Sequence, residues 1–388
     1  MKPDDFAAIG EFVLHHHIGM VIVGPEDPLV RGIHDYFLAD PRLKGIMVVG
    51  PVKRAAMLEG SKDFAKYFMH KYRIPTGSYR TFDKSSLGEG IAFLKTLKPP
   101  YVLKADGLAA GKGVIISHSL EEAVHELQSM IISEKFGTAG SKVIIEEYLD
   151  GIEVSVFILT DGKSYILLPE AKDYKRIGEG DTGLNTGGMG SISPVLFADS
   201  QFMEKVRARI IEPTIAGLNS EGIRYTGFIF FGLMNVGGDP YVIEYNARLG
   251  DPETESILPR IKNDLLELLI AASTGGLDKI SLETDPRYSA AVMVVSGGYP
   301  EDYKKGFAVS GLDSVSGSVV FHAGTRRDEK SGTILTNGGR VMAVSSQAPT
   351  LEEALKISNA NAARITFEGC YFRRDLGFDL TGLTGKLI

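Results

Sequence analysis

Two stretches of the sequence decide the fold: Lys104-Ala-Asp-Gly-Leu-Ala-Ala-Gly-Lys-Gly113 and Glu244-Tyr-Asn-Ala-Arg-Leu-Gly-Asp251. The first lies between two apolar, β-like runs, and its glycines leave backbone N–H groups open to close approach by phosphate oxygens. In the second, the period of two along a strand places Glu244 and Asn246 on one face and Tyr245 on the other. A carboxylate and an amide oxygen on one face are hard oxygen ligands of the kind that magnesium uses while it bridges nucleotide phosphates. Together the two stretches predict a nucleotide-binding site.

Neither common phosphate-binding motif fits the glycine-rich stretch. Gly107 and Gly111 are separated by three residues where a P-loop has four, and Lys112 is followed by Gly113 rather than by the Ser or Thr that would hold magnesium. The Gly-x-Gly-x-x-Gly pattern of a dinucleotide-binding fold is absent as well. Two plainer interpretations stay open: a hairpin loop without a chemical role for this stretch, and a solvated sheet edge for the Glu244 strand.

A third stretch, Glu146-Glu-Tyr-Leu149, ends a predicted strand and is followed by Glu153. The free N–H and C=O groups at such a chain end can read the edge of an adenine ring, with a carboxylate near the ribose hydroxyls. Many strands end in acidic residues, so this pattern alone does not decide between a nucleotide site and a solvated loop.

The composition is that of a globular protein with two or three domains. The chain has 388 residues, of which 44% are hydrophobic, and this is longer than a single core grows. Its 42 basic and 49 acidic residues give a net charge of -7 without a basic stripe, which argues against nucleic-acid binding. The single cysteine, Cys370, excludes an intramolecular disulfide and a Cys-based zinc site, and suits a reducing compartment. Because no signal-like segment and no bilayer-length apolar run is visible, we expect a cytoplasmic protein.

Hydrophobic periodicity and turn residues outline the expected elements. Near the N-terminus, helices at 6–16, 28–38 and 54–70 and strands at 19–24 and 45–50 predict an open α/β sheet. The middle of the chain is expected to contain a helix at 87–97, a helix opened by the capping box Ser119-Leu-Glu-Glu122, a strand at 142–147, hairpins that turn at 161–162 and 237–239, a long irregular stretch at 173–194, and helices at 199–219 and 263–274. A last unit at 290–378 is expected to be mostly β, with one helix opened by the capping box that starts at Thr350.

Six motifs follow one another along the chain and together carry a resemblance. They are Glu59-Gly-Ser-Lys62, the stretch 104–113, Asn185-Thr-Gly-Gly-Met-Gly190, Glu244-Tyr-Asn-Ala-Arg-Leu-Gly-Asp-Pro-Glu253, Val320-Phe-His-Ala-Gly-Thr325 and Thr336-Asn-Gly-Gly-Arg340. From about residue 19 to residue 378 the chain resembles the glycinamide ribonucleotide synthetases (phosphoribosylamine–glycine ligases), ATP-grasp enzymes of purine biosynthesis. Each motif alone is moderately specific, but all six in sequence leave little room for another family.

The resemblance implies a multidomain α/β and α+β protein with the ATP-grasp fold. We expect an N-terminal open α/β sheet domain at 1–78, a lid subdomain at 79–149, a central subdomain with the metal site at 150–285 and a mostly β C-terminal domain at 286–388. The implied reaction joins glycine to 5-phosphoribosylamine at the expense of ATP, through a glycyl phosphate, and gives glycinamide ribonucleotide, ADP and phosphate. The implied partners are these small molecules, with no nucleic acid and no membrane, and the protein is expected to act as a monomer.

The resemblance also assigns roles to residues of this sequence. The nucleotide would be held by Lys62, Lys104, Gly107, Gly111, Lys112 and Gly113, with Glu146 and Leu149 at the adenine edge and Glu153 at the ribose. Glu244 and Asn246 match the family's ligands for Mg²⁺ or Mn²⁺. Arg248, Asp251, Lys175 and Asp173 would act in catalysis, Arg248 by steadying the glycine carboxylate or the transferring phosphoryl group. The substrates would be bound by Gly24, Pro25, Glu26, Asn185, Gly187, Gly188 and Met189.

The N-terminus departs from the family pattern. The family has a strand, an Asn-Gly-Gly-Arg-Glu-His loop, a helix and a second strand ahead of the point at which this sequence starts, so the N-terminal domain is expected to lack its first strands. Because a truncated sheet would leave a central strand unpaired and apolar surface exposed, omission of residues from a longer protein is favoured over a truncated product. Two alternatives to the glycine ligase are another ATP-grasp purine enzyme and a nucleotide-binding module that has lost amine binding.

Overall fold

The computed structural model describes residues 1–108, 113–133, 135 and 140–380, which form two compact units. The first unit comprises Met1–Leu167, Ser200–Leu249 and Asp264–Ser281. The second comprises Leu168–Asp199, Gly250–Asn263 and the residues from Leu282 onward. Each unit is therefore assembled from segments that are distant in the sequence.

The N-terminal part of the first unit is an α/β layer, as the alternation of apolar runs and helical stretches predicts. The strands β1 (Met20–Ile22) and β2 (Met47–Val49) pair in parallel. Their buried side chains share a core with the neighbouring helices, whose members include Leu29 and Phe37. The helices of this part are α1 (Phe6–His15), α2 (Glu26–Arg31), α3 (Ile33–Ala39), α4 (Lys53–Gly60) and α5 (Lys62–Lys71).

Two of the helices expected in this part are each divided in two. Gly32, at φ +93°, ends α2 and starts α3, a left-handed conformation that glycine adopts at little cost. Ser61 is extended, and its Oγ accepts a hydrogen bond from Phe64 N (3.1 Å), so it ends α4 and caps α5. The predictions of single helices at 28–38 and 54–70 are therefore wrong, because the apolar period continues across both breaks.

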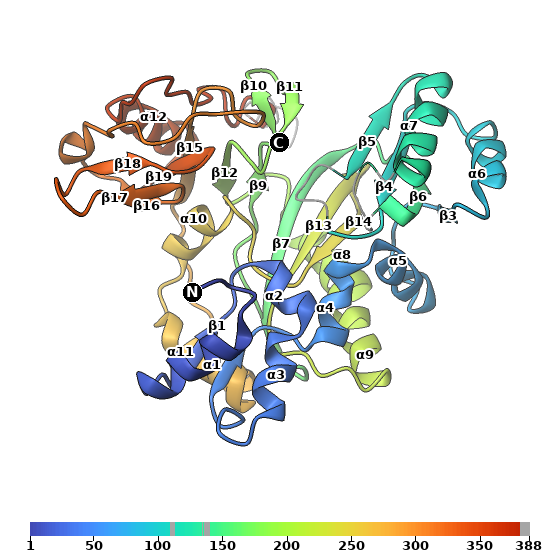
Figure 1. Cartoon of the computed structure of the whole chain (residues 1–388), viewed down its shortest axis with the longest axis horizontal. Helices are drawn as coiled ribbons and strands as arrows, with labels where there is room; N and C mark the ends of the chain where they lie inside the picture. Colours follow the sequence, from blue (N-terminus) through green and yellow to red (C-terminus); the bar gives the residue numbers. More distant parts are fainter. Residues whose placement is uncertain (109–112, 134, 136–139, 381–388) are drawn as a thin grey trace. The chain divides into compact units, whose positions relative to one another are not determined.

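A second part of the first unit is an antiparallel sheet with two helices on one face (Figure 1). Its strand order is β3 (Tyr79–Asp83), β6 (Lys142–Glu146), β4 (Tyr101–Ala105) and β5 (Val114–Ser117). Helices α6 (Leu87–Leu94) and α7 (Leu120–Ile132) share a hydrophobic core with it. The expected strand–loop–strand arrangement at 101–117 is confirmed, since β4 and β5 pair and Ala105 N donates to Gly113 O (2.8 Å). The strand β3 was not predicted, because its pairing partner β6 lies far along the chain.

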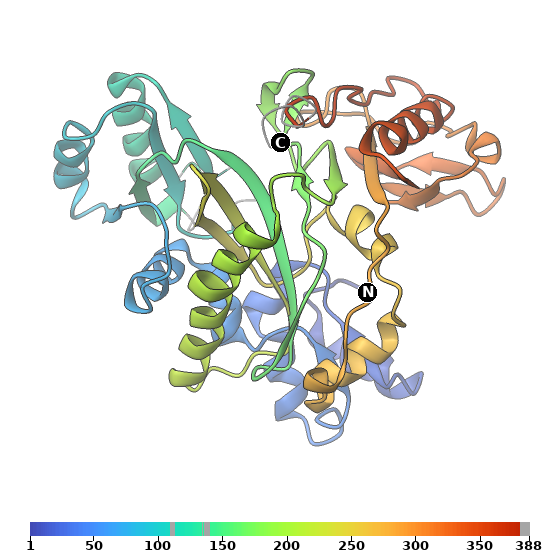
Figure 2. The same ribbon diagram turned by 180° about the vertical axis from the view of Figure 1, so that it is seen from behind.

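The third part of the first unit is a long antiparallel sheet of order β14 (Asp239–Asn246), β13 (Gly227–Val236), β7 (Ile152–Thr160) and β8 (Tyr165–Leu167). Both expected hairpins, β7–β8 and β13–β14, are confirmed. The helical run expected at 199–219 is also present: α8 (Ser200–Val206), a π-helical turn (Arg207–Ile211) and α9 (Glu212–Ser220) lie alongside this sheet (Figure 2). Helix α11 (Leu265–Thr274) begins at the cap Asp264 and packs on the same unit.

The second unit is mostly β, as expected. Its main sheet has the order β16 (Val319–His322), β19 (Arg340–Ala348), β15 (Tyr288–Val295), β12 (Gly190–Ser193) and β9 (Lys172–Asp173). Helix α12 (Leu351–Ala362) packs against β15 and β19 (Figure 1). The short helix α10 (Thr254–Ile257) and the strand pair β17 (Thr325–Arg327) and β18 (Ile334–Thr336) complete the unit's elements.

The stretch at 173–194 is more regular than predicted. The strands β10 (Arg176–Gly178) and β11 (Thr182–Asn185) form a small hairpin, and β9 and β12 join the main sheet on either side of it. Strands of two to four residues are too short to leave a periodic pattern. The pairing of β12 with β15, about a hundred residues later, is what orders this stretch.

Several local predictions are confirmed. Ser119 Oγ accepts from Glu122 N (3.4 Å), and Thr350 Oγ1 accepts from Glu353 N (3.2 Å), so both capping boxes start helices. Cys370 is half-buried, and burial raises the pKa of its thiol, which fits a packing residue rather than a nucleophile. Among the helices that the structure describes, none has both the length and the apolar character needed to cross a bilayer.

Candidate active site

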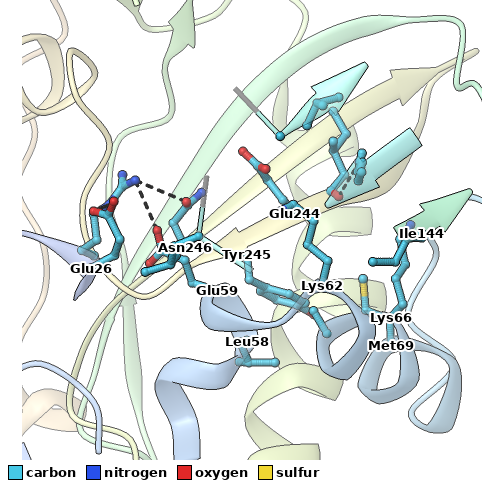
Figure 3. A pocket seen from close by; sticks show the side chains of 17 residues that line it. Glu26, Leu58, Glu59, Lys62, Lys66, Met69, Ile144, Glu244, Tyr245 and Asn246 are labelled. Atoms are coloured by element: carbon cyan, nitrogen blue, oxygen red, sulfur yellow. Dashed lines mark hydrogen bonds and ion pairs between the residues drawn. The ribbon is translucent and has the colours of Figure 1, made fainter. Parts of the chain in front are cut away.

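The first unit contains a pocket whose walls come from its two antiparallel sheets and from helices α2, α4 and α5 (Figure 3). Three lysines, three glutamates, one arginine and one asparagine line it together with apolar side chains. The lining residues are Glu26, Leu58, Glu59, Lys62, Ala65, Lys66, Met69, Lys104, Leu108, Gly113, Val114, Ile144, Ile243, Glu244, Tyr245, Asn246 and Arg248. The pocket thus brings together the glycine-rich stretch and the Glu244 strand, as the sequence predicts.

Lys62 enters the pocket because the helix breaks at Ser61. The backbone N–H of Lys62 donates to Asp106 O (3.1 Å), and its Nζ donates to Gly107 O (3.4 Å). Burial lowers the pKa of the Lys62 ammonium, and the Glu244 carboxylate opposes that shift. Lys62 is therefore a poorly hydrated cation beside the start of the glycine-rich loop, ready to pair with an anion.

Two further lysines share one buried carboxylate. Lys66 Nζ lies 2.6 Å from Glu146 Oε2, and Lys104 Nζ is ion-paired with Glu146 Oε1. All three side chains are less than 10% exposed. Burial alone would raise the pKa of Glu146, but the lysines outweigh it and hold the pKa of this carboxyl below its ordinary value. The cluster therefore carries one net positive charge in a water-poor place.

Glu244 and Asn246 lie on β14, which passes close to the lysines, since Lys104 Nζ donates to Ile243 O (3.4 Å). Tyr245, between them, donates to or accepts from Thr214 Oγ1 of α9 (2.9 Å) on the opposite face, as the strand period predicts. No hydrogen bond or ion pair to the described residues engages the Glu244 carboxylate. Asn246 Oδ1 accepts only a long hydrogen bond, 3.4 Å, from Arg248. Both oxygens are thus available to a cation.

The residues present fit a divalent cation that is shared with a bound ligand. Throughout residues 1–108, 113–133, 135 and 140–380, no group of three or more His, Cys, Asp or Glu side chains converges to form a protein-only metal site. Magnesium commonly takes one or two protein oxygens and completes its octahedron with water and substrate phosphates. The Glu244 and Asn246 pair matches that use, and the three pocket lysines supply partners for the phosphates.

Arg248 is held between two carboxylates. Its Nη2 lies 3.3 Å from Glu59 Oε1 and its Nε lies 3.5 Å from Glu26 Oε2. The other oxygen of Glu59 accepts from Ala247 N (2.7 Å), so Glu59 anchors the chain directly after β14. Burial raises the pKa of Glu59 to about 7, although Arg248 and the Ala247 N–H lower it. Figure 3 shows Glu26, Glu59 and Asn246 on the same side of the pocket.

Sequence reasoning missed two functional candidates, Glu59 and Lys66. Glu59 opens the Glu59-Gly-Ser-Lys62 motif, but only its hydrogen bond to Ala247, 188 residues away, shows what it does. Lys66 is one helical turn beyond Lys62, on the same face of α5, and this i, i+4 spacing was a usable signal.

Several predicted nucleotide contacts lie outside the lining of this pocket. Leu149 is half-buried after the end of β6, and Glu153, in β7, is paired across the sheet with Met234. Their assignments to the adenine edge and the ribose remain predictions. Gly111 and Lys112 are outside the described residues.

Of the predicted substrate-binding residues Gly24, Pro25 and Glu26, only one lines the pocket. Glu26 reaches the pocket, where it faces Arg248. Gly24 and Pro25 are exposed, and Pro25 precedes the first residue of α2. Their role in substrate binding remains a prediction.

The remaining predicted residues belong to the second unit. Asp173 Oδ1 lies 3.8 Å from Lys175 Nζ, and Asp251 Oδ2 accepts from Arg340 Nη2 (2.9 Å). Asn185, Gly187 and Gly188 precede β12; Asn185 and Gly187 are exposed and Gly188 is buried. Met189 is fully buried in a cluster with Met293 and Val295, so its side chain packs in the core of the second unit and anchors the loop there.

Three domains of one family match the chain in order. The N domain of phosphoribosylglycinamide synthetase matches residues 1–59, its ATP-grasp (A) domain matches residues 60–254, and its C domain matches residues 289–379.

Individual relatives cover most of the chain. It is 45% identical over 381 residues to the phosphoribosylamine–glycine ligase of Chlorobaculum tepidum, an alignment that covers 97% of this chain and 88% of that protein. It is 43% identical over 378 residues to a bifunctional purine biosynthetic protein of Pichia angusta, which covers 97% of this chain but 47% of that longer protein. The crystal structure of phosphoribosylamine–glycine ligase from Thermotoga maritima is similar with a TM-score of 0.82 and 37% identity, covering 94% of this chain and 88% of that one.

Glu146→Gln is expected to lower the free energy of unfolding by about 3–5 kcal/mol, because it leaves two buried ammonium groups without their counter-charge. The measurement is urea unfolding followed by circular dichroism. The matched control is Glu147→Gln, one residue further along, whose exposed carboxylate accepts only from Ser78 N (3.1 Å) and should cost less than about 1 kcal/mol. Equal losses for the two variants would contradict the buried cluster.

Glu59→Gln is expected to change how stability depends on pH. The folded-state pKa of Glu59, about 7, lies above the ordinary value of 4.5, so its contribution to stability is fully present below pH 4.5 and is lost as the pH rises to 7. Across this window the free energy of unfolding of the wild-type chain should fall by about 3 kcal/mol relative to that of Glu59→Gln. Urea unfolding at a series of pH values measures the difference, with the exposed Glu89→Gln as a control that should follow wild type. Parallel curves for wild type and Glu59→Gln would contradict the prediction.

Proposed function

The chain belongs to the phosphoribosylglycinamide synthetase family, and from this premise we propose that its pocket uses ATP to join glycine to 5-phosphoribosylamine. It is an ATP-dependent, ADP-forming carbon–nitrogen ligase of the ATP-grasp type. The observation that carries the proposal is the pocket itself, in which lysines of α5 and β4 and the oxygens of Glu244 and Asn246 surround one space. The product is glycinamide ribonucleotide, an intermediate of purine biosynthesis.

Two bond exchanges make up the reaction. A glycine carboxylate oxygen attacks the γ-phosphorus of ATP, ADP leaves, and glycyl phosphate forms. The amine nitrogen of 5-phosphoribosylamine then attacks the glycyl carbonyl carbon, inorganic phosphate leaves, and the nitrogen gives up a proton. The first exchange is needed because a carboxylate is a poor electrophile.

The lysines bind and orient the nucleotide phosphates. Lys62 and Lys104 flank the start of the glycine-rich loop, and their low exposure makes their attraction for a phosphate oxygen stronger than it would be in water. Lys66 and Glu146 keep Lys104 in place through the shared ion pair. Phosphoryl transfer depends mainly on such positioning and charge neutralisation.

Glu244 and Asn246 hold the divalent cation, Mg²⁺ or Mn²⁺. These residues would hold the cation, and a bound divalent cation would supply neutralisation of the charge that develops during phosphoryl transfer. The protein's own part is to present two oxygens from one face of a strand, with Tyr245 fixed on the other face by Thr214.

Arg248 steadies the carboxylate of glycine or the phosphoryl group in transfer. Glu26 and Glu59 restrict the guanidinium to one region of the pocket, and Glu59 also fixes the backbone at Ala247. A guanidinium held in this way loses little conformational freedom when an anion binds, so more of the contact energy is available for orientation.

The family motifs also include residues of the second unit. We assign Asp173, Lys175, Asp251 and the loop at 185–190 to the space for 5-phosphoribosylamine and the phosphates. Glu146, Leu149 and Glu153 are assigned to the adenine and ribose side. Both assignments rest on the family motifs that these residues match.

The experiment that tests the function measures ADP release in steady state with glycine, 5-phosphoribosylamine and ATP supplied singly and together. We expect rapid ADP formation only when all three substrates and a divalent cation are present. Tight ATP binding without turnover in the complete mixture would instead identify a nucleotide-binding module and contradict the proposal.

Glu244→Gln is expected to lower turnover on the order of 100-fold and to raise the magnesium concentration needed for half-maximal rate, because an amide is a weaker ligand than a carboxylate. Steady-state rates over a magnesium titration provide the measurement. Asp239→Asn, on the same strand but in a surface ion pair with Lys205 (3.0 Å), is the matched control and should behave as wild type. An unchanged magnesium dependence in Glu244→Gln would remove this residue from the metal site.

A further inference from the structure

The loop at 185–190 is held at the backbone N–H and the backbone C=O of one residue, Gly187, by residues far along the chain. Gly187 N donates to Tyr299 Oη (2.9 Å), and Gly187 O accepts from Arg340 Nη1 (2.7 Å). Gly187 itself is exposed, so its backbone would be free to reorient without these two bonds. All of these residues belong to the second unit.

One guanidinium joins this loop to Asp251. Arg340 Nη1 also donates to Asp251 O (2.9 Å), and Nη2 donates to Asp251 Oδ2 (2.9 Å). Three acceptors around one guanidinium suit the rigid fork of arginine, whereas the single ammonium of a lysine cannot satisfy them with the same geometry. The Arg340 side chain is 21% exposed, so it is a shielded rather than a fully buried group.

The rest of the loop is fitted closely to the same surroundings. Gly188 has φ +115°, and a Cβ there would lie 2.3 Å from Pro252 Cδ, so only glycine can take this position. Gly188 N donates to Thr186 Oγ1 (2.9 Å), and Thr186 in turn donates to Lys175 O. The loop therefore has one shape, fixed at Gly188 by steric fit and at Gly187 by Arg340 and Tyr299.

Arg340 and Tyr299 are themselves supported by one scaffold. Arg340 is the first residue of β19, which lies between β15 and β16 in the main sheet. A Cβ at Gly339 would come within 2.2 Å of Tyr299 Cδ2, so the backbone before Arg340 lies directly against the Tyr299 ring. The two side chains that hold Gly187 are thus placed by the same rigid element.

We infer that Arg340 and Tyr299 are positioning residues that fix the loop at 185–190, and with it Asp251, in the shape that receives 5-phosphoribosylamine. They act through the backbone N–H and C=O of Gly187, which they hydrogen-bond, and not by contact with the reacting atoms. The inference rests on the proposed function, because it concerns the acceptor of that reaction. It predicts a change in the KM for 5-phosphoribosylamine but not in the KM for ATP or glycine.

The test varies each substrate in turn for the full-length Arg340→Lys variant. We expect the KM for 5-phosphoribosylamine to rise about tenfold or more, from the loss of hydrogen bonds to a charged group. The KM values for ATP and glycine should stay within about twofold of wild type, as should kcat at saturating acceptor. The matched control is Arg287→Lys, which in the same unit disrupts surface contacts with Asp285 (2.7 Å) and Gln347 (3.1 Å) and should leave all three KM values unchanged.

Two further measurements separate positioning from a general structural role. Tyr299→Phe removes only the acceptor of the Gly187 N–H, so the same KM should rise by a smaller factor, about threefold. In Arg340→Ala, added guanidinium ion should restore part of the affinity for the acceptor, while sodium chloride at equal ionic strength should not.

The possible outcomes separate this inference from the function on which it rests. An unchanged KM for 5-phosphoribosylamine in Arg340→Lys, or an equal rise for all three substrates, would overturn the inference and leave the function intact. A wild-type chain that forms no ADP from the complete mixture would overturn both. If thermal unfolding shows that Arg340→Lys is not folded, Tyr299→Phe decides between the same outcomes.

Discussion

The pocket depends on buried positive charge that has too few anions of its own. Lys66 and Lys104 share the carboxylate of Glu146, and Lys62 lies nearby with its ammonium largely desolvated. Removing cations from water is costly unless counter-charges compensate it. One carboxylate for two lysines compensates only in part, so a phosphate chain entering this space gains electrostatic energy that the free protein lacks. This partial compensation is confined to the cluster of Lys66, Lys104 and Glu146, and it supports the proposal that nucleotide phosphates bind beside these lysines.

The opposite end of the pocket has the opposite sign. Glu59 and Glu26 flank a single guanidinium, that of Arg248, and burial keeps the pKa of Glu59 near 7. Glu244 adds a third carboxylate to the lining of the pocket. A triphosphate alone would be repelled at this end, whereas a triphosphate with a divalent cation presents both signs. The pocket therefore offers groups of both signs, as the proposed metal–nucleotide ligand requires. The like charges at each end of the pocket repel one another less when a ligand supplies the opposite charge.

The sequence predicts those parts of the site that depend on local patterns of residues. Strand alternation places Glu244 and Asn246 on one face, and the glycine-rich stretch between two strands is where it is expected. The helix break at Ser61 is invisible to apolar periodicity, yet it is the break that directs Lys62 into the pocket. Lys66 pairs with Glu146, 80 positions later, and Glu59 bonds Ala247, 188 positions later, and no local pattern reports such pairs. The strand β3 escaped prediction for the same reason, since it pairs with β6, which lies about sixty residues later.

The loop at 185–190 shows why motifs in this chain have meaning only in combination. Its glycines allow many backbone conformations, so they do not by themselves select one. The shape is selected by Arg340 and Tyr299, more than a hundred residues later, and by Pro252, which excludes any side chain at position 188. The Asn185-Thr-Gly-Gly-Met-Gly190 and Thr336-Asn-Gly-Gly-Arg340 motifs are therefore two parts of one structural unit. Each part is common in isolation, and only the hydrogen bonds between them make a loop of defined geometry, which is the property that a specific acceptor site requires.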